Sequence, residues 1–284
     1  MQYFGFDRPS FGIKTFGFGV SNSKLSADFT TGTYKADGAS KTFADLFTFN
    51  RAGKAWLVKD TGLQEYEADV PRLDDGLLIE QSATNYLSWS VLQGTDVQNY
   101  SSSGGVISSD DSILKTGKMY TYTKGVNSHS YKMFPASILN VDIYASRTDK
   151  QEVVLGGTGS AVNGYFNSVD LSAIKSKYNP VTGLTIVSAP LRTSPISLGI
   201  VKYTKQYLPN ADLRSHAMQA TEDDYSSSLI VTTTVPVTRP AEFLLNKITG
   251  TTVTGDWDST LNLSISNGQL VHSGYGRIRS LEIN

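Results

Sequence analysis

The sequence predicts an all-β protein built as a sandwich of antiparallel strands. Three observations predict it. The 284 residues include 15 tyrosines, 25 glycines and many Ser, Thr and Asn, a composition that favours short strands and turns. Several segments alternate apolar and polar residues with a period of two, and clear helical periodicity is scarce. A chain of this length can bury one sizeable core.

Alternation is clearest in three places. We expect strands over residues 140–145 and 229–237. Residues 261–266 alternate in the same way, reach an Asn-Gly pair at 267–268, and resume as an apolar run at 270–272. An Asn-Gly pair between alternating segments favours a two-residue turn, so we expect a β-hairpin here.

Turns and short strands also alternate between residues 49 and 87. Turn residues lie at 51–53, 60–62 and 74–76. We expect a strand over 55–58, between the first two turns. Pro71 then keeps the following segment extended, because it restricts its predecessor and lacks a backbone donor.

The last part of this region contains a charged residue that needs an explanation. An apolar strand is expected over 77–79, and Glu80 follows it directly. A buried carboxylate requires a partner, which Arg51 or Arg72 could supply. Asn85 lies in a polar corner, where its side chain can satisfy backbone groups before the apolar run resumes.

The order of these motifs resembles a module of tailed-bacteriophage virion proteins, among them tail fibres, tailspikes and related appendages. There a run like DFTTG is followed by FxRA, an aromatic residue, a DxxG turn, a PR pair, GLLIE and ATN. The matching residues are 28–32, 49–52, Trp56, 60–62, 71–72, 76–80 and 83–85. The sequence VTRPAE at 237–242 is similar to a closing VTRAAD segment, with Pro240 and Glu242 as the departures.

This resemblance implies a jelly-roll or concanavalin-like β-sandwich over residues 25–242, similar to lectins and carbohydrate-binding modules. It implies a place on the virion surface, assembly in the host cytoplasm, and a homo-oligomer, with a trimer favoured. The shared motif belongs to the scaffold and does not identify sugar-contacting residues. The scaffold residues it assigns are Arg51, Trp56, Pro71, Arg72, Glu80 and Asn85.

The first 24 residues have a separate composition. Five phenylalanines are interleaved with glycines: Phe4, Phe6, Phe11, Phe16 and Phe18. So many aromatic rings on a glycine-rich backbone cannot form a core alone and need another surface to cover them. We expect a docking arm that binds another virion protein or a neighbouring copy. The alternative is an outer strand on the same sandwich, and the aromatic content disfavours a disordered tail.

Residues 243–284 are predicted to be a small β-hairpin appendage. It is too short to be stable alone. It either adds to the sandwich or packs against identical appendages around a three-fold axis.

Charge and composition exclude several classes of partner. Lys and Arg number 25 against 26 Asp and Glu, so no broad basic face is available for nucleic acid. No apolar run is long enough to span a membrane, and the first residues lack the pattern of a secretory signal, so we expect no membrane insertion. The absence of cysteine removes disulfides and thiolate metal sites.

The sequence offers no clear catalytic or metal site. The three histidines, His129, His216 and His272, are isolated, and no Gly-x-Ser-x-Gly elbow is present. The acid clusters at 74–75 and 222–224 are better explained as turns than as calcium ligands. We therefore expect no catalytic residue, metal or cofactor.

Glycan binding would use exposed aromatic side chains as stacking platforms. Four aromatics lie near loop-like sequence: Trp89, Tyr100, Tyr165 and Trp257. For each of them a core position is the favoured alternative.

The leading hypothesis is a non-enzymatic virion surface protein, anchored by its arm and displaying a lectin-like sandwich to host polysaccharide. The second is a purely architectural collar, head-fibre or capsid-decoration protein. The third is a glycan-cleaving enzyme.

Overall fold

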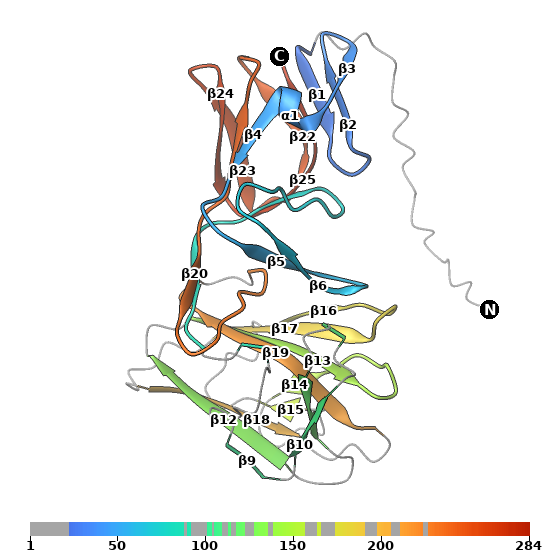
Figure 1. Cartoon of the computed structure of the whole chain (residues 1–284), viewed down its shortest axis with the longest axis vertical. Helices are drawn as coiled ribbons and strands as arrows, with labels where there is room; N and C mark the ends of the chain where they lie inside the picture. Colours follow the sequence, from blue (N-terminus) through green and yellow to red (C-terminus); the bar gives the residue numbers. More distant parts are fainter. Residues whose placement is uncertain are drawn as a thin grey trace, which may run out of the picture.

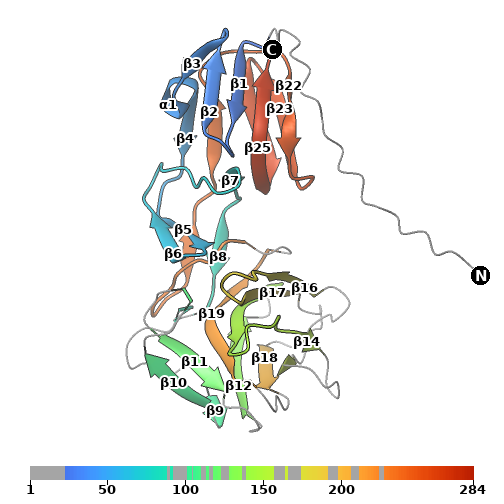
Figure 2. The same ribbon diagram turned by 90° about the vertical axis from the view of Figure 1, so that its right-hand side faces the viewer.

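The structure is a computed structural model and is almost entirely β. It describes residues 23–87, 90–91, 101–103, 105–109, 113–114, 118–122, 128–135, 139–156, 164–165, 174–190, 198–205, 211–223 and 227–284. Strands contain 53% of the described residues and helix 2%, which confirms the all-β prediction. Figures 1 and 2 show two β-lobes arranged along the long axis, with a narrower neck between them.

The first lobe combines strands from both ends of the chain. Its main sheet has the order β22–β25–β1–β2–β3, and β7 pairs with the start of β25. Every pair in this sheet is antiparallel. The strand bounds are β1 Leu25–Asp28, β2 Thr33–Ala36, β3 Ala39–Lys41, β7 Leu77–Ile79, β22 Val253–Trp257 and β25 Gly276–Ile283.

Two hydrogen-bonded pairs of strands form the other layer of this lobe. β4 (Phe47–Asn50) pairs with β21 (Phe243–Asn246), and β23 (Leu261–Ser266) pairs with β24 (Gln269–Gly274). The one helix among the described residues, α1 (Phe43–Leu46), leads into β4 and begins with a capping box formed by Thr42 and Asp45. Both layers contribute to one apolar core. Its members include Leu25, Ala27, Phe29, Phe47, Leu244, Leu261, Leu270, Ile278 and Leu281.

The second lobe contains two larger sheets. The first has the order β10–β11–β19–β13–β17–β16 and the second the order β14–β15–β18–β12–β9. All their pairs are antiparallel except β14 with β15. The bounds of the first are β10 Gly105–Ser109, β11 Lys118–Tyr122, β13 Asn140–Arg147, β16 Lys175–Tyr178, β17 Leu184–Pro190 and β19 Leu213–Thr221. Those of the second are β9 Ser101–Ser103, β12 Ser128–Pro135, β14 Leu155–Gly156, β15 Gly164–Tyr165 and β18 Leu198–Lys205.

The neck consists of two short antiparallel pairs. β5 (Ala55–Lys59) and β6 (Gly62–Tyr66) form a hairpin. β8 (Ala83–Asn85) pairs with β20 (Val237–Arg239). The chain therefore enters the second lobe after β8 and returns through β20, and these two strands lie side by side.

The C-terminal residues are part of the first lobe. β25 lies between β22 and β1 in the main sheet, and Leu281 of β25 is the register partner of Ala27 in β1. Residues 243–284 add strands to both layers of the first lobe. They share its core with residues 25–49 and so form one packing unit with them.

Most of the strands expected from sequence are present, and one is not. The predicted strands at 55–58, 77–79 and 140–145 lie in β5, β7 and β13. The hairpin at 261–272 is β23–β24, and its turn residues Asn267 and Gly268 have φ of 50° and 78°, as an Asn-Gly turn requires.

The strand predicted at 229–237 is wrong, because only its last residue lies in a strand, β20. Side chains satisfy the backbone of this segment where a neighbouring strand would otherwise do so. Asn85 Nδ2 donates to the Ile230 carbonyl at 2.8 Å, and the Ile230 amide donates to Gln219 Oε1 at 2.9 Å. Leu229 and Ile230 are adjacent and both buried, so the apolar residues of this segment do not follow the two faces of a strand.

The docking-arm prediction lies almost wholly outside the described residues. Phe4, Phe6, Phe11, Phe16 and Phe18 precede residue 23, where the described part of the chain begins. Their role stays a prediction.

Candidate functional site

Five charged residues from distant parts of the sequence meet in the neck. Arg51 follows β4, Glu80 follows β7, and Arg239 ends β20. These three, together with Arg72 and Glu242, have between 0% and 3% of their surface exposed. We call this group the ion cluster. Every member lies in one of the FNRA, PR, GLLIE or VTRPAE segments.

Arg72 is the centre of the ion cluster. Its Nη2 atom donates to Glu80 Oε2 at 2.6 Å and to Glu242 Oε2 at 2.7 Å, and its Nε atom donates to Glu242 Oε1 at 3.0 Å. Its Nη1 atom donates to the Trp56 carbonyl at 3.1 Å and to Ser228 Oγ at 2.5 Å. A planar guanidinium group is suited to this role, because its donors point in fixed directions.

Two further arginines complete the pairing. Arg51 Nη1 lies 2.8 Å from Glu242 Oε1, and Arg239 Nη1 lies 2.9 Å from Glu80 Oε2. Arg51 also donates to the carbonyls of Gly53 at 2.8 Å and Glu67 at 2.6 Å. The three guanidinium groups therefore share two carboxylates, and backbone carbonyls take up donors of Arg51.

The carboxylate of Glu80 is held in its ionised form. Burial alone would raise the pKa of the Glu80 carboxyl. The charges of Arg239 and Arg72 outweigh that effect, together with hydrogen bonds from the Ser228 amide and hydroxyl, and they lower the pKa from its ordinary 4.5 to about 2. In the same way, burial would lower the pKa of Arg72, but Glu80 and Glu242 raise it.

This chemistry is structural. Each carboxylate of the ion cluster accepts at least three charge-assisted or backbone hydrogen bonds. The five side chains are buried, and both carboxylates are taken up by these partners. They fix four chain segments against one another, because removing one partner from a buried ion pair leaves an uncompensated charge.

Asn85 performs the corner role expected from the sequence. Its Oδ1 atom accepts from the Leu87 amide at 3.1 Å and the Ala220 amide at 3.0 Å, and its Nδ2 atom donates to the Ile230 carbonyl. The side chain is 0% exposed. Asn85 thus joins the start of the second lobe to β19 and to the segment that leads back to β20.

The remaining scaffold residues act through their backbone or position. Trp56 lies in β5, half-buried, and contributes its carbonyl to Arg72. Pro71 directly precedes Arg72 in a segment without regular secondary structure.

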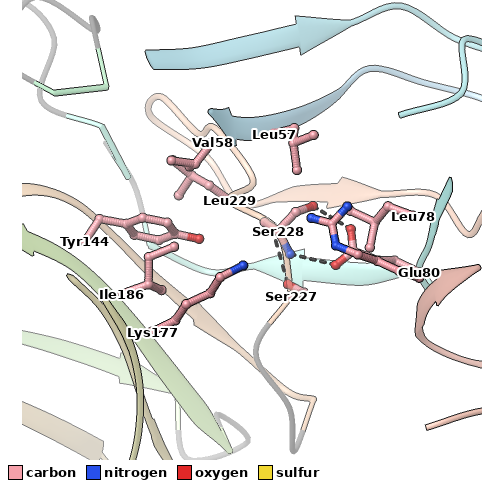
Figure 3. A pocket seen from close by; sticks show the side chains of 11 residues that line it. Leu57, Val58, Leu78, Glu80, Tyr144, Lys177, Ile186, Ser227, Ser228 and Leu229 are labelled. Atoms are coloured by element: carbon pink, nitrogen blue, oxygen red, sulfur yellow. Dashed lines mark hydrogen bonds between the residues drawn. The ribbon is translucent and has the colours of Figure 1, made fainter. Parts of the chain in front are cut away.

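A cleft of about 200 Å³ lies beside the ion cluster (Figure 3). It is lined by Leu57, Val58, Leu78, Glu80, Tyr144, Lys177, Ile186, Ser227, Ser228, Leu229 and Arg277. These residues come from β5, from β7 and the residue after it, from β25, from the segment between β19 and β20, and from the β13–β17–β16 part of the second lobe. The cleft is therefore formed where both lobes meet the neck.

Of the four aromatic residues considered for glycan binding, Trp257 and Tyr165 lie in described strands. Trp257 lies in β22, half-buried and packed against the core of the first lobe. Tyr165 lies in β15, of which the structure describes the backbone. Trp89 and Tyr100 lie outside the described residues, so their role stays a prediction.

One serine and one histidine lie within hydrogen-bond distance of each other. Ser146 Oγ is 2.8 Å from His216 Nε2, across β13 and β19. Burial, with a further contribution from Arg214, lowers the pKa of His216 to about 3. Both residues are buried, with His216 at 0% exposure, so a substrate cannot reach this pair.

Within the described ranges, no three His, Asp or Glu side chains are grouped to hold a metal ion. No helix in the same ranges is long and apolar enough to cross a bilayer. No known family model matches the chain, and no curated protein is significantly similar to it in sequence.

Two members of the ion cluster were not expected from the sequence as charge partners. Arg239 and Glu242 lie in the VTRPAE segment, whereas the partner expected for Glu80 was either Arg51 or Arg72. Ser228 also carried no signal, since a serine in a polar run has no distinguishing pattern.

Proposed function

We propose that the chain is a non-enzymatic structural protein of a bacteriophage particle, displayed on the particle surface. One observation supports the proposal most. The charged residues of the phage-type motif meet in one buried ion cluster. Such a cluster holds chain segments together, as expected for a motif with a structural role rather than a ligand-binding role. An all-β body with two sheet-containing lobes agrees with a displayed, lectin-like module.

In this proposal the N-terminal arm attaches the chain to another virion protein, and the lobes face outward as a homo-oligomer, with a trimer favoured. Contact with host surface polysaccharide is the display function. The second candidate is a purely architectural role in a collar, head fibre or capsid decoration. It is favoured by Phe243, Leu245 and Val271 on β21 and β24, which are 53%, 39% and 46% exposed and would suit a contact with another virion protein.

Two experiments test these roles in turn. The first uses particles of a phage whose genome encodes this sequence, labelled with an antibody against the chain. Electron microscopy should then show the antibody on the particle surface. Particles without the chain would refute both candidates. A glycan array with the purified full chain then separates the two candidates. Saturable binding to a surface polysaccharide supports the glycan-binding role, and the absence of binding to every glycan tested supports the architectural role. Release of reducing ends from such a polysaccharide would support the glycan-cleaving alternative instead.

A further inference from the structure

One wall of the cleft is a single row of the large sheet in the second lobe. Tyr144 of β13 is the register partner of Ile186 in β17, and Ile186 is the register partner of Lys177 in β16. Residues directly opposite each other on neighbouring strands share a face of the sheet. The row therefore presents a phenol, an aliphatic side chain and an ammonium group to the same space.

The hydroxyl group of Tyr144 points into the cleft (Figure 3). Tyr144 is 2% exposed, and its hydroxyl has no hydrogen-bond partner among the described residues. Burial raises the pKa of Tyr144 well above 10, and the charges of Asp142 and Glu80 add to this against an opposing effect of Arg239. The hydroxyl therefore stays protonated. The hydroxyl faces the cleft without an acceptor from the described protein, so an acceptor group of a ligand bound there could take its hydrogen bond in place of water.

Lys177 contributes the one free cation in the described lining of the cleft. Its side chain is exposed and has no ion-pair or hydrogen-bond partner in the described ranges. Figure 3 shows its ammonium end turned toward Ser227 and Ser228, on the same side as the Tyr144 hydroxyl. Arg277, also in the lining, is already bonded to the Asp74 carbonyl.

The rest of the cleft is largely aliphatic or already paired. Leu57, Leu78 and Leu229 form apolar walls, and the Glu80 carboxylate is occupied by two arginines and Ser228. The volume of about 200 Å³ exceeds that of an engineered cavity of roughly 150 Å³ that binds benzene. A compact ring or short chain with one acceptor group fits this space.

We propose that this cleft binds a small monocarboxylate with an aliphatic body. The two carboxylate oxygens accept hydrogen bonds from the Tyr144 hydroxyl and the Lys177 ammonium group, and the body lies against Leu57, Leu78 and Leu229. A single charge is specified because Lys177 is the one uncommitted cation in the described lining. This site is independent of the virion role proposed above, since it depends on the row and the cleft alone.

Cyclohexanecarboxylate is a suitable probe, titrated into the full chain and followed through the methyl signals of Ile186 and Leu229 by NMR. We expect saturable shifts with a dissociation constant on the order of 1 mM. The neutral analogue cyclohexanecarboxamide should bind about fivefold more weakly or worse, because it lacks the charge that Lys177 recognises.

Conservative variants locate the site. Tyr144→Phe and Lys177→Gln should each weaken binding about three- to tenfold. Lys175→Gln is the matched control, because Lys175 lies on the same strand and face but in the next row, opposite Ser188. It should change binding by less than about twofold.

Three results would overturn the proposal. The first is no saturable shift of either methyl signal at about 10 mM probe, roughly ten times the expected dissociation constant. The second is equal affinity for the amide. The third is an equal loss of binding in Lys175→Gln and Lys177→Gln. Thermal unfolding of each variant confirms that it is folded before it is scored.

Discussion

The ion cluster makes a sharp prediction for Arg72→Met. The substitution keeps much of the side-chain volume but removes three hydrogen bonds to carboxylates, at 2.6, 2.7 and 3.0 Å. Glu80 and Glu242 would each keep one arginine partner, Arg239 and Arg51, yet both would remain buried with less compensation. Breaking a buried ion pair in this way costs about 3–5 kcal/mol of unfolding free energy.

Urea denaturation followed by tryptophan fluorescence and circular dichroism measures this loss. The control is Lys54→Met, which removes ion pairs to Glu65 at 2.6 Å and Glu67 at 3.2 Å that are about half exposed. Such exposed pairs contribute roughly 0–1 kcal/mol. Arg72→Lys should fall between the two, because it keeps the charge but loses the planar fork. A loss below about 1 kcal/mol for Arg72→Met would refute the central role of Arg72.

Three further predictions concern the stability of the fold: its dependence on pH through Glu80, and its response to substitutions at Gly274 and Asn85. The Glu80 pKa of about 2 lies below its ordinary 4.5, so its contribution to stability is complete above pH 4.5 and is lost as pH falls toward 2. The free energy of unfolding, measured across this window, should fall by roughly 3 kcal/mol. Glu80→Gln, though less stable at pH 6, should show a smaller change of unfolding free energy with pH. Gly274→Ala should lower the free energy of unfolding by at least about 2 kcal/mol more than Gly38→Ala. Both glycines have positive φ, but only at Gly274 would the added Cβ lie 2.0 Å from the Thr260 carbonyl oxygen. Equal losses of stability in thermal melts would contradict this. Asn85→Ala should cost about 3 kcal/mol by leaving buried backbone groups unpaired. Thr84→Ala, at a half-buried position, removes one hydroxyl–hydroxyl bond to Thr238 and should cost about 1 kcal/mol or less.

Local patterns predicted local structure well. The Asn-Gly turn at 267–268 and the strand over 140–145 follow from rules that involve only neighbouring residues. The strand expected at 229–237 failed for the opposite reason. Adjacent Leu229 and Ile230 are both buried, and the backbone of Ile230 bonds to the side chains of Asn85 and Gln219. Those partners are distant in sequence, so a periodicity argument cannot find them.

The charged site was predictable in part. That Glu80 would need an arginine follows from the cost of a buried charge, and Arg72 is indeed its partner at 2.6 Å. Arg51, the other candidate, pairs with Glu242 instead. The choice between them depends on how β4, β7 and β21 lie in space, and sequence spacing does not fix that.

The cleft could not have been anticipated, because it depends on register. Tyr144 and Lys177 are 33 positions apart in the sequence and meet through their shared partner Ile186. A shift of one residue in either strand pair would turn one of the two side chains to the opposite face of the sheet. No composition or motif argument carries that information.

The path of the chain brings the segments before and after the second lobe together. The second lobe is inserted between β8 and β20, which pair with each other, and the ion cluster lies at this crossing. Glu242 of the returning segment also accepts from the Glu80 amide at 2.9 Å, and its own amide donates to the Glu80 carbonyl at 3.0 Å. These bonds fix the entry and the exit of the insertion to each other. The expected scaffold residues at 49–85 and those at 237–242 therefore lie on either side of the inserted lobe in the sequence and meet at its base in the structure.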